Sequence, residues 1–74
     1  MDEAVERAAL AVLNLRLDPV CGRVAPPKPD AGDWLVDIEL PGESSEVIRG
    51  STPIVALASA AEWVERALRV RRAG

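Results

Sequence analysis

An alternation of apolar and polar residues over positions 34–40, broken only by Leu35, constrains this chain more than any other feature. In an extended strand, even and odd positions in this segment point to opposite faces. The even face is entirely apolar and consists of Trp34, Val36, Ile38 and Leu40. The odd face carries Leu35, Asp37 and Glu39, and its two carboxylates lead us to expect that it meets solvent. The sequence therefore predicts a half-buried strand whose apolar face packs against helices.

The residues after this strand predict an antiparallel hairpin over 34–49. Pro41 and Gly42 are typical turn residues, and positions 46–49 predict a shorter second strand. Six carboxylates lie between Asp30 and Glu46 with no Lys or Arg among them, which predicts an acidic face on the hairpin. Two strands alone are marginally stable, so the hairpin must be covered by other elements.

A long helix is predicted over 53–70. Thr52 is a suitable N-cap, and Pro53 suits the first helical position because its missing N–H would be unpaired there. The stripe expected to face the sheet consists of Ile54, Leu57, Ala58, Ala61, Val64 and Leu68. A second set of apolar residues widens this stripe and consists of Val55, Ala60, Trp63, Ala67 and Val70. We interpret this excess either as part of the core, the commoner place for a large apolar residue, or as a partner surface around Trp63.

The first third of the chain predicts another helix, from residue 2 to about 13. One of its faces carries apolar residues at three- and four-residue steps: Met1, Val5, Ala8, Val12 and Leu15. The end of this helix stays open, because the leucines at alternate positions 13–17 are also compatible with a strand. Four prolines make residues 18–32 irregular, with a possible short strand near 23–25. The expected fold is a single α+β domain over 1–74 with a two- or three-stranded antiparallel sheet.

The composition argues against catalysis and metal binding. The chain has no histidine and one cysteine, Cys21, so it lacks a histidine base, a histidine metal ligand and an internal disulfide. The pair Asp37 and Glu39 is more simply the solvated side of a strand than an acid–base pair. We therefore expect no catalytic residues, no metal and no cofactor. The N-terminus lacks a signal-peptide pattern and no apolar run reaches membrane-spanning length, which predicts a cytoplasmic protein without membrane contact.

Two family resemblances fall on residues 34–60. Strand 34–40, the Pro-Gly turn and the Gly-x-Thr-x-x-x-Ala-Leu pattern at 50–57 are similar to HicB-type antitoxins, although that family lacks the N-terminal helix expected here. The order of helix, strands and helix resembles the double-stranded RNA-binding domain. That domain uses lysines at the start of its last helix, where this chain has Pro53, Ile54 and Val55. The first resemblance implies an inhibitor that binds a protein, and the second implies only an arrangement of elements.

These observations predict a non-enzymatic protein-binding module, such as an antitoxin-like inhibitor, a regulator or a small accessory subunit, acting on a protein partner or a second copy of itself. The expected binding residues are Trp63, Val55, Ala60, Ala67, Val70, Asp37, Glu39 and Glu43. One alternative is a nucleic-acid-linked regulator that uses the C-terminal arginines, Arg66, Arg69, Arg71 and Arg72. Another is an acidic mimic of nucleic acid that inhibits a nucleic-acid-binding enzyme.

Overall fold

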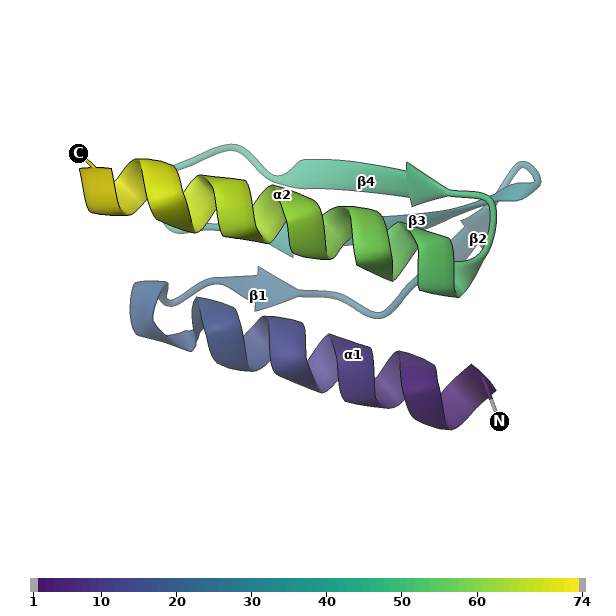
Figure 1. Cartoon of the computed structure of the whole chain (residues 1–74). Coiled ribbons are helices and arrows are strands. Elements are labelled where there is room, and N and C mark those ends of the chain that lie inside the picture. The colour runs from purple at the N-terminus through teal and green to yellow at the C-terminus, as the bar shows by residue number, and fades with distance from the viewer. Residues whose placement is uncertain (1, 74) are drawn as a thin grey trace.

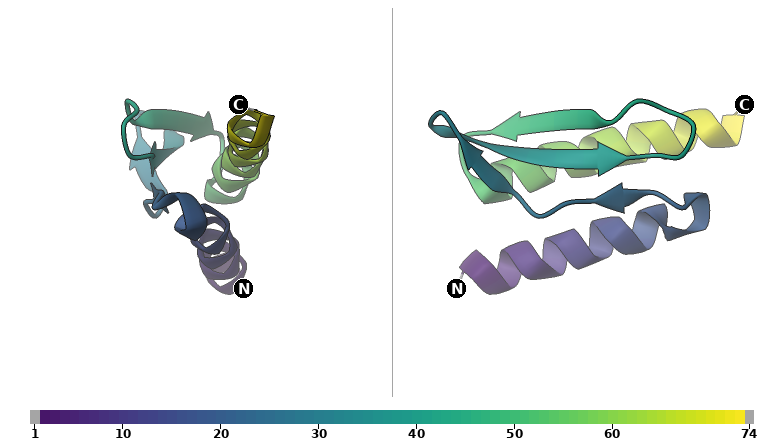
Figure 2. Two further views of the ribbon diagram at one scale, coloured as in Figure 1. Left: turned by 90° about the vertical axis from the view of Figure 1, so that its left-hand side faces the viewer. Right: turned by 180° about the vertical axis from the view of Figure 1, so that it is seen from behind.

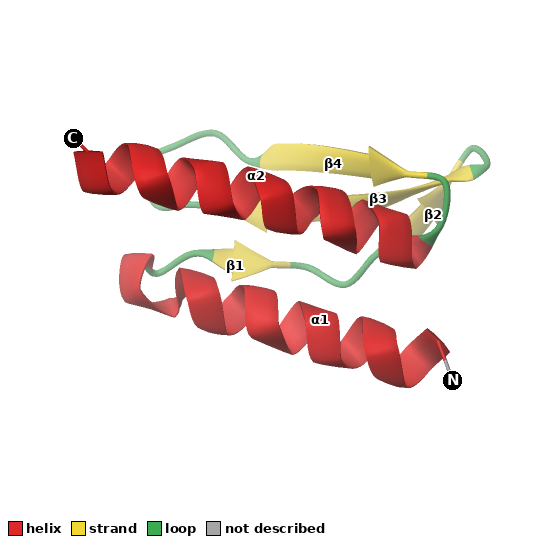
Figure 3. Ribbon diagram, viewed as in Figure 1, coloured by secondary structure: helices red, strands yellow, loops and turns green. Residues whose placement is uncertain are grey.

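The computed structural model describes the backbone of residues 2–73 and the side chains of residues 3–71. The elements are α1 (Asp2–Leu17), a 3-10 turn (Asp18–Val20), β1 (Arg23–Val24), β2 (Lys28–Asp30), β3 (Asp33–Glu39), β4 (Glu46–Gly50) and α2 (Pro53–Ala73). Figure 3 shows the two helices together with an antiparallel sheet. The expected α+β fold is therefore confirmed, including the hairpin and the C-terminal helix.

Strand β3 is the centre of the sheet. β4 pairs with one edge of β3, from Trp34 opposite Gly50 to Ile38 opposite Glu46. β1 and β2 pair one after the other with the opposite edge. The sheet thus has four short strands in three rows, where the sequence predicted two or three strands. Figure 2 shows that the sheet is twisted.

β1 and β2 are two parts of one edge strand, separated by a bulge. Val24 lies opposite Ile38 and Lys28 lies opposite Leu35, so the three residues 25–27 face the two residues 36–37. The extra residue falls where Pro26 and Pro27 remove two backbone donors. This edge strand then returns to β3 through a two-residue turn, in which Ala31 and Gly32 both have positive φ, 49° and 89°.

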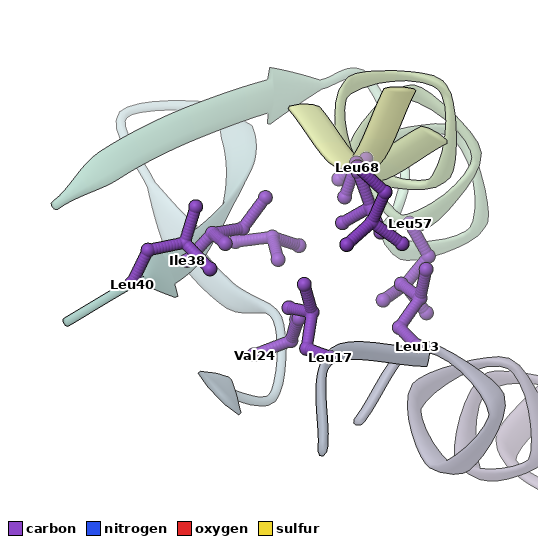
Figure 4. Close-up of a cluster of buried hydrophobic side chains, with 11 residues drawn as sticks. Leu13, Leu17, Val24, Ile38, Leu40, Leu57 and Leu68 are labelled. Atoms are coloured by element: carbon purple, nitrogen blue, oxygen red, sulfur yellow. The ribbon is translucent and has the colours of Figure 1, made fainter. Parts of the chain in front are cut away.

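Both helices lie on the same side of the sheet, side by side and running in the same direction (Figure 1). α2 crosses β3 and β4, whereas α1 contacts β1 and α2. The core between them is apolar and consists of Leu13, Leu17, Val24, Val36, Ile38, Leu40, Ala56, Leu57, Ala60, Val64 and Leu68. Figure 4 shows the labelled side chains of α1, β1, β3 and α2 pointing toward one another, with Leu40 just beyond the end of β3. The inward face predicted for 34–40 is confirmed, with Trp34 half-buried at its edge.

Asn14 joins α1 to the edge of the sheet. Its side-chain Nδ2 donates to the carbonyl oxygen of Val24 at 3.1 Å, and the backbone N–H of Val24 donates to its Oδ1 at 2.9 Å. The amide group therefore pairs with β1 as a neighbouring strand would. Nδ2 also donates to the carbonyl oxygen of Leu10 at 3.1 Å, which holds the side chain against its own helix.

The first helix is longer than predicted and turned differently. It continues to Leu17, because Leu13 and Leu17 enter the core one turn apart while Leu15 points outward and is 76% exposed. The stripe recognised in the sequence therefore faces away from the core, with Val5 56% and Val12 59% exposed. Met1, its first member, lies outside the described residues.

The second helix is also rotated relative to the expected stripe. Leu57, Val64 and Leu68 are buried as predicted, but Ile54 and Ala58 are exposed beside α1. Ala56 and Ala60 are completely buried. The cause is close packing at the start of the helix, since a Cβ on Gly50 would lie 2.3 Å from the backbone nitrogen of Ala56. Small residues allow this approach, so they take the positions closest to the sheet.

Candidate protein-binding site

A shallow groove of about 280 Å³ beside Trp63 brings together part of the predicted binding surface. We call it the Trp63 groove, and it is lined by Glu43, Trp63, Arg66, Ala67, Val70 and Arg71. Three of its apolar residues lie on one side of α2, because positions 63, 67 and 70 follow the helical spacing of four and three residues. Glu43 comes from the loop between β3 and β4. The groove therefore lies between the second half of α2 and the β3–β4 loop.

Trp63 is both part of the core and part of the groove. Its ring is half-buried and packs against the buried cluster, while its indole Nε1 donates to Oε2 of Glu46 at 3.0 Å. The two interpretations of this residue made from the sequence thus describe two sides of one ring. Fixed by packing and by a hydrogen bond, the ring loses little conformational freedom when a ligand covers its open side.

The rim of the groove is charged. Arg71 forms an ion pair with Glu43 across the groove, which ties the end of α2 to the β3–β4 loop. Arg66 is exposed and takes part in none of the ion pairs found among the described side chains. Val70 is 71% exposed beside them. An apolar floor with an available guanidinium suits a ligand that carries an apolar group next to a carboxylate.

Two of the predicted apolar binding residues do not belong to this groove. Ala60 is completely buried, so the prediction that it contacts a partner is wrong: it packs in the core of the domain. Val55 is 44% exposed, but it lies in the first turn of α2, two turns before Trp63. Sequence spacing could not separate these cases, because it does not show which side of the helix meets the sheet.

The outer face of the sheet carries both signs of charge, which corrects the expected acidic face. Asp37 pairs with Lys28 of the neighbouring strand at 3.4 Å, and Glu39 lies opposite Arg23. On the other edge, Arg49 lies 3.4 Å from Asp30 and 3.7 Å from Asp33. These cations are far from the carboxylates in sequence, and the strand pairing places them next to each other. Neither Asp37 nor Glu39 lines the Trp63 groove, although Glu39 and Glu43 both line a second hollow nearby.

The C-terminal arginines do not form one basic surface among the described side chains. Arg66 and Arg69 are exposed on α2 next to Glu62 and Glu65, whereas Arg71 turns to Glu43. Glu65 itself pairs with Arg16 of α1, with Nε of Arg16 2.9 Å from Oε2. The side chain of Arg72, the fourth residue of the predicted set, lies outside the described part. The arginines thus alternate with carboxylates, which weakens their attraction for phosphates.

A second, more polar hollow of about 510 Å³ contains Cys21, together with Asp18, Arg23 and Glu39. Cys21 is exposed and has a positive φ of 59° where the 3-10 turn ends. Among the described residues, no three histidine, cysteine or acidic side chains gather closely enough to hold a metal ion.

The structure is that of a small α+β protein with an open groove beside Trp63. No protein-family model matches the chain, and no curated protein or solved structure matches it. The resemblance of residues 34–60 to HicB-type antitoxins and to double-stranded RNA-binding domains therefore stays a prediction. Neither helix, over its described residues, combines the length and the apolar content that crossing a bilayer requires.

Proposed function

We propose that this protein is a non-enzymatic protein-binding module that receives an apolar segment of its partner in the Trp63 groove. The observation that carries the proposal is the tryptophan ring, held by the core on one side and open to the groove on the other. Tryptophan and arginine are the residues most enriched at the energetic centres of protein interfaces. Here Trp63 lines the groove together with Arg66, Arg71 and the exposed Val70.

The charges around the groove define the chemistry of the partner segment. Arg71 is already paired with Glu43, so Arg66 is the cation available to a ligand carboxylate. We expect the bound segment to present one large apolar side chain to Trp63 and Ala67 and an Asp or Glu to Arg66. A regulator, an inhibitor of the antitoxin type or an accessory subunit would each use such a contact. The single cysteine fits a reducing compartment such as the cytoplasm.

The experiment that tests this proposal is affinity capture from source-organism lysate with nuclease treatment, comparing the wild type with Val70→Glu. Val70 is 71% exposed, so the variant keeps its fold while placing a carboxylate where the partner's own carboxylate approaches. We expect one dominant protein that Val70→Glu fails to retain. Binding of the purified pair should then weaken about 30-fold or more.

The matched control is Val47→Lys on the outer face of the sheet, another exposed valine, which does not line the groove and should retain the partner. Capture that is equal for both variants would contradict the groove as the binding site. Retention of material that disappears with nuclease, together with binding that falls steeply with salt, would favour the nucleic-acid alternative based on Arg66 and Arg69.

A further inference from the structure

Helix α1 exposes an uninterrupted apolar face on the side opposite the core. We call it the α1 outer face, and it consists of Ala4, Val5, Ala8, Ala11, Val12 and Leu15, all exposed. At 3.6 residues per turn these six positions cover a sector of about 120°. The charged residues of α1 with described side chains fall outside this sector and are Glu3, Glu6, Arg7 and Arg16. In Figure 2 the α1 ribbon contacts the rest of the protein on one side only.

The outward side of α2 shows that this pattern is not general in the molecule. There the exposed positions include four charged residues, Glu62, Glu65, Arg66 and Arg69. A helix on a protein surface ordinarily has this charged outward side. In α1 the arrangement is reversed, since Leu15 at 76% is the most exposed of the large apolar side chains among the described residues. Such a surface is typical of an interface.

We propose that the α1 outer face binds the same face of a second copy of this chain, with the two α1 helices antiparallel. The first reason is the spacing. Val5, Ala8, Val12 and Leu15 follow one another at steps of three, four and three residues, which is the pattern that packs two helices along a common seam. An antiparallel pair centred between positions 8 and 12 places Val5 against Leu15 of the second copy, and Ala8 against Val12 of the second copy.

The second reason is the distribution of charge along α1. Glu3, Glu6 and Arg7 lie near its N-terminus, which leaves a net negative charge there, and Arg16, which also pairs with Glu65 of α2, lies in its last turn. In an antiparallel pair the acidic end of each helix comes beside the basic end of the other, and the two helix dipoles oppose each other. A parallel pair would bring like charges together. The charges and the dipoles therefore favour the antiparallel orientation over the parallel one.

The extent of the surface sets the strength of the association. The exposed fractions of Val5, Val12 and Leu15 amount to about two whole side chains in each copy. The same apolar surface continues from Val5 and Val12 into a groove of about 290 Å³ between the helices, where it meets Ile54 and Ala58. The apolar surface that each copy offers is smaller than a permanent dimer interface. We therefore expect a dissociation constant on the order of 10–100 µM. This dimer leaves the Trp63 groove open, because the groove involves no residue of α1.

Sedimentation velocity between about 5 µM and about 500 µM tests self-association directly. We expect the wild type and Val47→Lys to change from monomer to dimer over this range. Val12→Lys should stay monomeric, since it places a charge in the centre of the seam, and Val12→Thr should weaken the dimer without adding charge. Circular dichroism of each variant checks that the fold is retained. A wild type that is monomeric throughout, or a dimer unaffected by both Val12 variants, would refute the proposal.

Cysteine crosslinking tests the orientation. In a Cys21→Ser background, Val5→Cys and Leu15→Cys are prepared separately and oxidised alone and as a mixture. An antiparallel pair keeps the two Val5 positions about 15 Å apart along the axis, beyond disulfide reach, but brings position 5 beside position 15 of the other chain. We expect crosslinked product only in the mixture. Efficient crosslinking of each variant alone would show a parallel pair and overturn the antiparallel assignment.

Discussion

Replacing Asn14 by alanine should destabilise this protein strongly, because this part-buried side chain joins α1 to the edge of the sheet. The side chain takes part in three hydrogen bonds, one to Leu10 and two to the backbone of Val24. Val24 is 2% exposed, so its N–H and C=O have little access to replacement water. A buried backbone group left without a partner costs about 1–3 kcal/mol. Allowing for partial access of water, we expect the free energy of unfolding to fall by about 2–4 kcal/mol.

Urea unfolding followed by tryptophan fluorescence measures this loss at low protein concentration, with an unchanged slope if the unfolding remains two-state. A loss of about 3 kcal/mol should lower Tm by roughly 12–24 °C for a chain of this size. Ala11→Asn on the exposed side of the same helix is the control for helix propensity, and it should cost less than about 1 kcal/mol. A loss below about 0.5 kcal/mol for Asn14→Ala would refute the role of Asn14 as a substitute strand.

The variant Asn14→Asp tests the two hydrogen bonds to Val24 separately. Its carboxylate still accepts from the N–H of Val24, but it places a second acceptor next to the carbonyl oxygen that Nδ2 of Asn14 contacts at 3.1 Å. Protonation restores a donor, so the protonated form is the one that stabilises the fold. The difference in stability between Asn14→Asp and the wild type should therefore shrink as the pH falls below about 4 and grow as the pH rises. A difference that does not change with pH would contradict this geometry.

Two further predictions concern the backbone. Gly50→Ala should cost about 3 kcal/mol or more, because the new Cβ would lie 2.3 Å from the nitrogen and 2.6 Å from the Cα of Ala56, and a backbone cannot give way as a side chain does. A calorimetric Tm equal to that of the wild type would exclude this contact. Ala31→Asn should raise the free energy of unfolding by about 0.5–1 kcal/mol, since alanine at a φ of 49° is strained in the turn between β2 and β3 and asparagine is favoured there. Chemical denaturation of both proteins checks it, and a destabilised Ala31→Asn would mean that the turn differs from this geometry.

The local elements of this protein follow from short stretches of its sequence. The alternation over 34–40 predicts β3 and its buried face, and Thr52 and Pro53 predict the start of α2. The cap is observed as a hydrogen bond from the N–H of Val55 to Oγ1 of Thr52 at 3.1 Å. Pro41 and Gly42 form the predicted turn, with Gly42 at a φ of 81° and the N–H of Glu43 donating to the carbonyl oxygen of Leu40. Such features depend on neighbours a few residues apart, so the sequence contains them completely.

The tertiary structure decided which side of each helix became the core. The stripe of α1 with the strongest spacing faces outward, because Leu10, Leu13 and Leu17 form a competing stripe that packs inside. Both stripes satisfy the helical period, and only the position of α2 and β1 distinguishes them. The same holds for Ala60, which the sequence assigns to a partner surface and the packing of α2 on the sheet assigns to the core.

Pairing between distant segments decided which charged side chains lie next to each other and which residues line the Trp63 groove. Strand register brings Lys28 and Arg49 to carboxylates that look like an acidic run in the sequence, and the β3–β4 loop brings Glu43 to Arg71 at the edge of the Trp63 groove. The sequence alone determined the kinds of side chain available: no histidine, one cysteine, two tryptophans and an excess of apolar positions on its helices. Which of those positions are open to a partner depends on contacts between residues far apart along the chain, and periodicity within one element carries no information about them.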